Sequence, residues 1–217
     1  MTLPSALPWE RIGRQLRQPT GLAGRLLGQA MEIANRQPNR AAIAALDIGP
    51  GDDVLELGFG PGAAIKVLAE LAPAGKIYGV DQSQVMLDLA CRRNRAAIRA
   101  GQVVLKLGSF DSLPLPDCSV SRILAVNVAY FWSHPTPILK ELKRVLRPGG
   151  SIAIYVTEAS TMRRWKFATP QTHRTFDRQA LTELLRNGGF GDDRITIVET
   201  RPALGVRGLV ATVSKAP

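Results

Sequence analysis

Residues 54–62, which read VLELGFGPG, constrain the fold of this chain more than any other segment. The four mostly apolar residues at its start predict a short buried strand, and the alternate glycines Gly58, Gly60 and Gly62 predict a sharp turn after it. Glycine lets the backbone approach a ligand closely, because no Cβ stands in the way. A helical pattern begins at residue 63, and its first N–H groups are unpaired. The segment therefore predicts a strand, a ligand-binding loop and the N-terminus of a helix.

The same alternation of strand and helix patterns continues to the C-terminus. Short apolar runs predict strands at 54–57, 76–80, 102–107, 121–126, 151–156, 194–199 and 206–213. Helical spacing of apolar residues predicts helices at 63–71, 83–98, 137–146 and 177–187. Strands joined by helices favour a parallel sheet covered on both faces. We expect a doubly wound α/β fold, mostly parallel and seven-stranded, whose ligand binds beyond the carboxyl ends of the strands.

Several local features of these elements are also predictable. We expect the helix at 63–71 to bury Ile65, Leu68 and Leu71. Ser83 is a good N-cap for the helix that follows it. Residues 147–150, which read RPGG, predict a helix stop and a turn before the fifth strand.

Residues 1–48 are predicted to form a helical extension, and 49–217 the ligand-binding domain. The pair Gln-Pro at 37–38 predicts a break in the helix, after which Asn39 caps a short second helix at 39–46. Three roles are compatible with this pattern: packing against the domain, closing over its pocket as a lid, and contact with an anionic membrane surface. One apolar stripe at helical spacing consists of Leu22, Leu26, Ala30, Ile33 and Ala34.

Charge and cysteine content narrow the class of protein. The 28 Lys and Arg against 18 Asp and Glu give a net charge of +10, which favours anionic partners without determining the fold. The only cysteines, Cys91 and Cys118, are too few for a disulfide framework or a zinc cluster, and no metal site is predicted. The sequence contains no run of 18 or more apolar residues, so no transmembrane helix is predicted. Residues 1–5 do not resemble a signal peptide, so a cytoplasmic protein is expected.

An acidic residue follows the second predicted strand. Asp81 is placed where doubly wound folds hold ribose hydroxyls. Dinucleotide folds carry G-x-G-x-x-G beside a pyrophosphate, whereas this chain carries G-x-G-x-G with Glu56 just before it. A carboxylate at that position suits a ligand with positive charge. An adenosine-containing ligand is therefore indicated, and a nicotinamide dehydrogenase is disfavoured.

Five segments in order resemble the motifs of class I S-adenosylmethionine-dependent methyltransferases, in particular the small-molecule group. The resemblance covers about residues 40–160 and implies a Rossmann-like methyltransferase fold. It also implies S-adenosyl-L-methionine as cofactor and in-line methyl transfer to a small-molecule acceptor, aided by proximity and orientation. The segments are 56–62 (ELGFGPG), 78–81 (YGVD), 108–117 (GSFDSLPLPD), 126–132 (VNVAYFW) and 142–150 (LKRVLRPGG).

The resemblance implies roles for single residues at the cofactor. Glu56 would support the methionine ammonium group, and Asp81 would hold the ribose hydroxyls. Ser109 and Phe110 would border the adenine, although family members often carry Asp where this chain has Ser109. The other residues implied to contact the cofactor are Gly58, Phe59, Gly60, Gly62, Gln82 and Asn127.

Candidate acceptor residues follow the fourth strand. Asn127, Tyr130 and His134 are the catalytic candidates, with ordinary packing or helix capping as their alternatives. His173 is a weaker candidate. A basic segment at 161–174 has no acidic residue and can receive a carboxylate or phosphate, unless it is simply a solvated loop. Its charged and aromatic residues are Arg163, Arg164, Trp165, Lys166, Phe167 and Arg174.

Two other functions fit the same residues. An RNA methyltransferase is suggested by the charge, but Asn127-Val128-Ala129-Tyr130 lacks the proline of the usual adenine-amino motif and no RNA-binding module is recognisable. A non-catalytic protein that binds an adenosine ligand would keep the same glycine loop and acid. The sequence favours a small-molecule acceptor, with nucleic acid disfavoured, and leaves the acceptor atom and the oligomeric state open.

Overall fold

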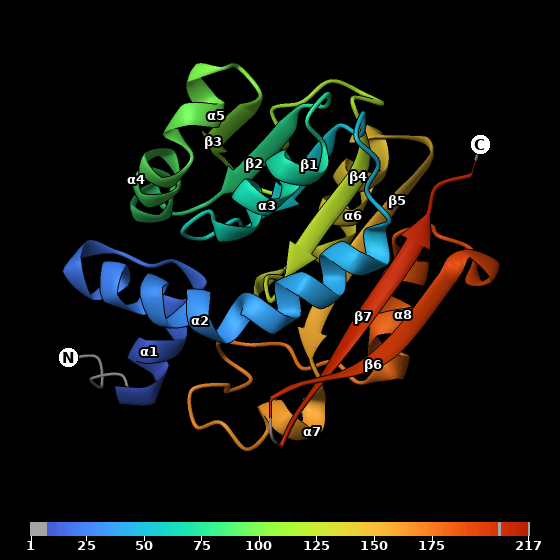
Figure 1. Ribbon diagram of the computed structural model, residues 1–217. Coiled ribbons are helices and arrows are strands. Elements are labelled where there is room, and N and C mark those ends of the chain that lie inside the picture. The colour runs from blue at the N-terminus through green and yellow to red at the C-terminus, as the bar shows by residue number, and fades with distance from the viewer. Residues whose placement is uncertain (1–7, 204, 217) are drawn as a thin grey trace.

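The computed structural model describes residues 8–203 and 205–216, and a seven-stranded sheet forms its centre (Figure 1). The strand order is β3-β2-β1-β4-β5-β7-β6, with only β7 antiparallel to its neighbours. This confirms the doubly wound, mostly parallel fold. The strands are β1 (Val54–Leu57), β2 (Ile77–Asp81), β3 (Val103–Leu107), β4 (Val120–Val126), β5 (Leu146–Thr157), β6 (Ile195–Ala203) and β7 (Val206–Ser214).

Helices cover both faces of the sheet. One face packs against α2 and α3 in a buried cluster that includes Leu46, Ile65 and Leu124. The opposite face packs against α6 and α8. The helices are α1 (Pro8–Arg17), α2 (Gly21–Leu46), α3 (Ala63–Leu71), α4 (Gln84–Arg93), α5 (Arg95–Arg99), α6 (Pro135–Val145), α7 (Ala159–Met162) and α8 (Arg178–Asn187), with 3₁₀ turns η1 (Ala129–Phe131) and η2 (Asp192–Arg194).

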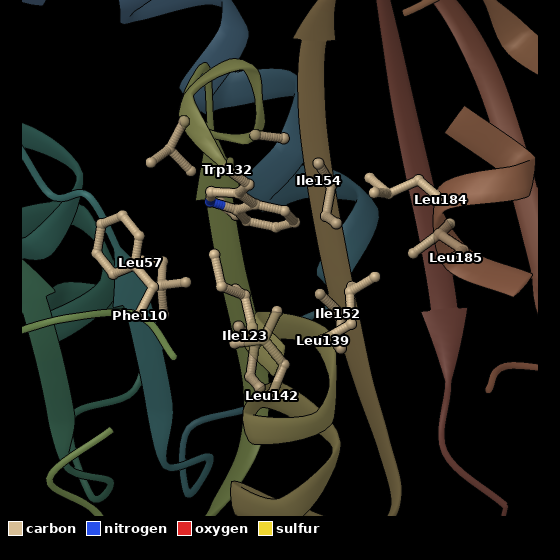
Figure 2. Close-up of a cluster of buried hydrophobic side chains, with 14 of the residues drawn as sticks. Leu57, Phe110, Ile123, Trp132, Leu139, Leu142, Ile152, Ile154, Leu184 and Leu185 are labelled. Carbon is tan, nitrogen blue, oxygen red and sulfur yellow. The ribbon is translucent and has the colours of Figure 1, made fainter. Parts of the chain in front are cut away.

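The second cluster is the larger one and is shown in Figure 2. Trp132 lies at its centre beside Ile154, with Leu184 and Leu185 of α8 on the far side. Leu139 and Leu142 of α6 face Ile123 and Ile152 in the same view. Trp132 is therefore a core residue that fixes the loop after β4 to the sheet.

The topology places the site. β1 lies between β2 and β4 and is parallel to both. From β1 the chain continues to β2, toward one edge of the sheet, and from β4 it continues to β5, toward the other edge. The strand order therefore reverses at the β1–β4 pair. Ligand crevices of doubly wound folds form at this switch point, beyond the carboxyl ends of the strands.

The predicted break at residues 37–38 is wrong. α2 runs without interruption from Gly21 to Leu46 and contains Pro38. A proline inside a helix removes one hydrogen bond and costs about 3 kcal/mol, but the buried residues Ala42, Ile43 and Leu46 anchor the helix on the sheet. The ribbon of α2 bends between its two halves in Figure 1, as a helix with an internal proline does.

The apolar stripe of the extension is largely exposed and is not packed into the core. Leu26 is 69% exposed and Ile33 is 75% exposed, and Ala30 and Ala34 are exposed as well. Apolar spacing alone cannot tell a buried face from an exposed one, and the face that packs carries smaller residues such as Gly28 and Ala42. The side chain of Leu22 and the whole of residues 1–7 lie outside the described part of the chain.

Three smaller predictions also need correction. Leu71 ends α3 and is 41% exposed, so it does not face the core. The predicted helix at 83–98 divides at Asn94, whose side-chain amide donates to the carbonyls of Gly62 and Ala90. The predicted turn at 147–150 is part of β5, where it forms an irregularity opposite β4. Ser83 caps α4 as expected, since its Oγ accepts from Met86 N.

Candidate functional site

The glycine loop joins β1 to α3 at the switch point. Gly58, Gly60 and Gly62 have φ angles of +67°, +51° and +79°, which side chains with a Cβ rarely adopt. A Cβ on Gly58 would lie 2.8 Å from Val128 Cγ2. Around Gly60, in contrast, no atom of the described residues other than Gly60 and its two chain neighbours lies within 4 Å of a Cβ placed there. Gly60 therefore borders open space, where a ligand can approach the backbone.

Asp81 ties the second strand to this loop. Gly60 N donates to Asp81 Oδ2 at 2.9 Å, and Ser83 N donates to Oδ1 at 2.8 Å. Burial raises the pKa of Asp81 to about 6, although these two backbone hydrogen bonds act in the opposite direction. The glycine loop and the acidic residue, found separately in the sequence, form one site.

Glu56 is a buried carboxylate on β1. Its side chain is 3% exposed, and Oε2 has no hydrogen-bond partner among the described residues. Burial, and then the negative charge of Asp81, raise the pKa of Glu56 well above its ordinary value. A buried charge without a partner is costly, usually by several kcal/mol. A cationic group bound beside Glu56 would supply the missing partner.

These residues line a hollow that we call the loop cavity, with a volume of about 70 Å³. Four further residues that the sequence predicts at the cofactor also border it: Phe59, Gln82, Phe110 and Asn127. Gly62 lies behind the loop, against Ala90 and Asn94. Ser109 is exposed and donates to Asp111, outside the loop cavity as the described residues outline it.

The N-terminal helices cover the loop cavity, an arrangement that the sequence left open beside simple packing. We call the covering segment, residues 16–39, the roof. Ser83 Oγ donates to Pro19 O at 2.6 Å, and Gln18 Nε2 donates to Gln82 O at 3.1 Å. Arg93 pairs with Glu32 at 2.7 Å. The described roof residues that line the cavity are Leu16, Arg17, Pro19, Met31, Glu32, Asn35 and Asn39.

A signal for part of the roof was available in the sequence. Glu32 and Asn35 lie on the side of α2 opposite the apolar stripe when residues are placed 100° apart. Polar residues on the helix face that packs toward the protein say more about a binding site than exposed apolar residues do. That pattern indicates that α2 covers a polar site.

Asn127 joins the roof to the sheet. Its φ is +55°, a conformation in which asparagine is enriched. Asn127 Nδ2 donates to Asn35 Oδ1 at 2.8 Å, and Tyr130 OH donates to Asn127 Oδ1 at 2.7 Å. Tyr130 OH also accepts from Thr157 N, and burial raises the pKa of Tyr130 above its usual value. The network fixes the amide of Asn127 in one orientation.

A second hollow begins on the other side of Asn127. We call it the aromatic cavity; its volume is about 550 Å³, within the usual range for small-molecule pockets. It shares Leu16, Met31, Asn35, Asn127 and Phe131 with the loop cavity. Its other described walls are Ile33, Ala34, Gln37, Pro38, Tyr130, Tyr155, Thr157, Met162, Trp165, Phe167, His173, Pro202, Ala203 and Val206.

The two histidines are placed differently. His173 is buried in the wall of the aromatic cavity, with Nδ1 2.9 Å from Thr172 Oγ1 and its ring 4.8 Å from that of Phe131. Burial lowers the pKa of His173 to about 4. His134 is exposed before α6 and lies outside both cavities as the described residues define them. The structure therefore brings Asn127 and Tyr130 together but leaves His134 apart.

Two further observations bear on the kind of site. Within residues 8–203 and 205–216, no three His, Cys, Asp or Glu side chains gather as metal ligands would. The described helices include none long and apolar enough to cross a membrane.

Comparison with known proteins identifies the family. Residues 55–154 match the model of the "Methyltransferase domain" family. The "Uncharacterized methyltransferase YdaC" of Bacillus subtilis is 32% identical over 83% of this chain and 94% of its own. This chain belongs to the class I S-adenosylmethionine-dependent methyltransferases. Three further curated relatives, 31–37% identical, are matched over less than half of their own length.

Solved structures of methyltransferases share the fold. A putative methyltransferase of Haloferax volcanii, in complex with the Trm112 methyltransferase activator, has a TM-score of 0.75 at 20% identity, covering 88% of this chain and 93% of that one. A SAM-dependent methyltransferase of Aquifex aeolicus has a TM-score of 0.66 at 18% identity, covering 94% of this chain and 98% of that one. The cofactor of this methyltransferase is S-adenosyl-L-methionine.

Proposed function

We propose that this methyltransferase transfers a methyl group from S-adenosylmethionine to a small, largely apolar molecule bound in the aromatic cavity. One observation carries the proposal: the loop cavity and the aromatic cavity adjoin and share Asn35, Asn127 and Phe131. A cofactor on one side of Asn127 and an acceptor on the other would then meet at this residue. Bringing two reactants together in the right geometry lowers a barrier by about 7–11 kcal/mol.

The residues of the loop cavity fit the parts of the cofactor. Glu56 Oε2, which has no hydrogen-bond partner in the described part of the chain, suits the methionine ammonium group. The remaining acceptor capacity of the Asp81 carboxylate suits the ribose hydroxyls. Gly60 leaves its backbone open to the ligand. When bound, the cofactor supplies a methyl group on a positively charged sulfur, which makes the carbon electrophilic without help from the protein.

The aromatic cavity supplies orientation and exclusion of water. Tyr130 keeps its proton, because burial raises its pKa, and holds the amide of Asn127 toward the boundary of the two cavities. Phe131 and Phe167 form apolar walls. Of the described lining residues none is a carboxylate, and His173 is the basic side chain among them. Because its pKa is low, His173 is a weak base. This favours an acceptor whose methylated atom loses its proton readily or carries none.

The first experiment is a parallel calorimetric titration with S-adenosylmethionine, S-adenosylhomocysteine and NAD. We expect the first two to bind and NAD not to bind. Asp81→Ala and Gly60→Val should abolish binding, the second because its side chain would enter the loop cavity. Arg92→Gln, on the exposed face of α4, is the control that should bind normally.

The second experiment uses radiolabelled S-adenosylmethionine with a panel of apolar small molecules and with total RNA. We expect label in the small-molecule fraction, and loss of that label in Ala34→Trp, which narrows the aromatic cavity. Labelled RNA with an unlabelled small-molecule fraction would support the RNA alternative and contradict the proposal. Cofactor binding without transfer to either class would support a non-catalytic role.

A further inference from the structure

A basic hollow at the tip of the β6–β7 hairpin shares two wall residues with the aromatic cavity. This hollow, which we call the arginine mouth, is lined by Ser160, Arg164, Ala203, Val206 and the arginines 201 and 207. Ala203 and Val206 belong to both hollows. The loop cavity, the aromatic cavity and the arginine mouth therefore follow one another in space.

The arginine mouth carries an excess of positive charge. Arg164 Nη2 donates to the carbonyl of Gly205, which holds this side chain against the hairpin. Arg207 pairs with Glu199 at 3.3 Å, but both side chains are half exposed, so this pair is weak. Arg163 is exposed next to Arg164 and adds to the charge.

The distance between the edge of the mouth at Val206 and Thr157, which contacts Tyr130 beside Asn127, follows from strand pairing. Thr157 N donates to Tyr130 OH, which in turn donates to Asn127. Thr157 pairs with Gly208 on β7, two residues from Val206. A rise of about 3.4 Å per residue and a strand spacing of about 4.8 Å place Val206 roughly 8 Å from Thr157. A molecule of two or three fused or linked rings spans such a distance.

We propose that the acceptor is a molecule with an apolar ring system and one acidic group. The ring system fills the aromatic cavity, and the acidic group is held by Arg164, Arg201 and Arg207. This rests on the proposed function and specifies its substrate class. Guanidinium groups bind carboxylate, sulfonate and phosphate oxygens through charge-assisted hydrogen bonds. The apolar walls exclude charge from the region beside the sulfonium, so the acidic group and the methylated atom lie at opposite ends of the molecule.

The test uses two fluorescent probes that differ by one acidic group. 1-Anilinonaphthalene-8-sulfonate carries a sulfonate, and N-phenyl-1-naphthylamine has the same rings without it. Titrated into protein saturated with S-adenosylhomocysteine, the sulfonate probe should bind at least tenfold more tightly. In the triple variant Arg164→Gln, Arg201→Gln, Arg207→Gln that preference should fall below threefold, with the affinity of the neutral probe unchanged.

A matched triple variant separates local recognition from net charge. Arg92→Gln, Arg95→Gln, Arg99→Gln removes three exposed cations from α4 and α5, and it should retain the tenfold preference. Ala34→Trp should weaken binding of both probes, which locates their rings in the aromatic cavity. Equal loss in both triple variants, or no effect of Ala34→Trp, would overturn the inference.

Refutation of the arginine mouth can be distinguished from failure of the proposed function. Cofactor binding is measured by calorimetry on the same variants, and none of the seven substitutions lies in the loop cavity. If the wild-type chain does not bind S-adenosylmethionine, the proposed function fails. If it binds the cofactor and the arginine triple variant keeps its preference for the sulfonate, only the arginine mouth is refuted.

Discussion

The side-chain amides of Asn35 and Asn127 are hydrogen-bonded at 2.8 Å, although 92 residues separate them in the chain. Asn35 belongs to the roof, Asn127 follows β4, and both line the two cavities, so this bond lies at the boundary between the loop cavity and the aromatic cavity. The same Asn127 amide accepts from Tyr130. One residue thus connects the covering helices, the sheet and both cavities.

Asn127→Gly should reduce catalysis more than cofactor affinity. Glycine tolerates the φ of +55°, so the variant removes the amide and keeps the backbone. Two side-chain hydrogen bonds are lost, at about 1 kcal/mol each in the free energy of unfolding. We expect kcat to fall about 10- to 100-fold, since misplaced reactants lose much of the benefit of proximity.

Two variants control for this result. Asn127→Ala adds backbone strain of about 1–2 kcal/mol at a left-handed residue, so it should melt at a lower temperature than Asn127→Gly. Asn35→Ala breaks only the bond to the roof and should have a smaller effect on kcat. An unchanged kcat in Asn127→Gly, measured at saturating cofactor and acceptor, would contradict a positioning role.

The sequence predicts the centre of the fold better than its cover. Val54–Leu57 is a buried strand with neighbours on both sides, and its glycine loop needs conformations that few other residues adopt. Local pattern and tertiary structure therefore agree there. In the roof they disagree, because Pro38 is tolerated only through packing of the helix around it, and Ile33 is apolar but exposed.

The candidate site was predictable where adjacent strands end, and less so where distant segments meet. Glu56, Asp81 and Asn127 each follow or occupy a parallel strand, so their proximity follows from topology. His134 and His173 could not be ranked, because their distance from the site depends on how the loops after β4 and β5 fold. Arg207 comes near the aromatic cavity only through the β5–β7 pairing, which no local pattern specifies.

Cofactor binding should strengthen as the pH rises from about 5 to 7. In the ligand-free protein, burial raises the pKa of Glu56 and raises that of Asp81 to about 6. The bound ammonium and ribose hydroxyls favour the ionised carboxylates, so binding releases protons in this range. Calorimetry in buffers with different ionisation enthalpies measures the protons released.

Glu56→Gln gives the matched comparison, since it keeps the shape of the side chain and removes its titration. It should bind S-adenosylmethionine more weakly at pH 7 and release fewer protons. Proton uptake on binding, or the same proton release in Glu56→Gln as in the wild type, would show that Glu56 does not face the cationic end of the cofactor.

His173 should stay neutral throughout the working pH range. Burial lowers its pKa to about 4, below the value of about 6.5 in an unfolded chain. Between pH 6.5 and 4 the unfolded chain binds a proton at this histidine and the folded chain does not. The free energy of unfolding is therefore highest above pH 6.5 and falls by up to about 3 kcal/mol as the pH drops toward 4. The chain has two histidines, so proton NMR should show one ring signal that does not titrate above pH 5.

Activity gives an independent check on the same residue. We expect the pH profile of kcat/KM between 6 and 8 to keep its shape in His173→Gln, because the ring has no ionisation there to lose. His134→Gln, on the surface, serves as the control histidine. A limb with a pKa near 6.5 that disappears only in His173→Gln would show that the ring titrates as a catalytic base.

We expect the roof to move when the cofactor binds. The loop cavity has a volume of about 70 Å³, whereas pockets that bind molecules as large as this cofactor have volumes of about 300 Å³ or more. The contacts that hold the connection between α1 and α2 are single hydrogen bonds, such as Ser83 to Pro19 and Gln18 to Gln82. Such weakly held segments open at low free-energy cost.

Hydrogen–deuterium exchange should therefore change most in residues 8–20 when S-adenosylhomocysteine binds. We expect these amides to exchange rapidly in the free protein and at least tenfold more slowly in the complex, while those of α6 and α8 remain unchanged. Gln18→Ala, which removes one contact of the connection, should speed exchange of the free protein and raise the cofactor on-rate. Equal protection of residues 8–20 with and without ligand would mean that the cofactor enters by another route.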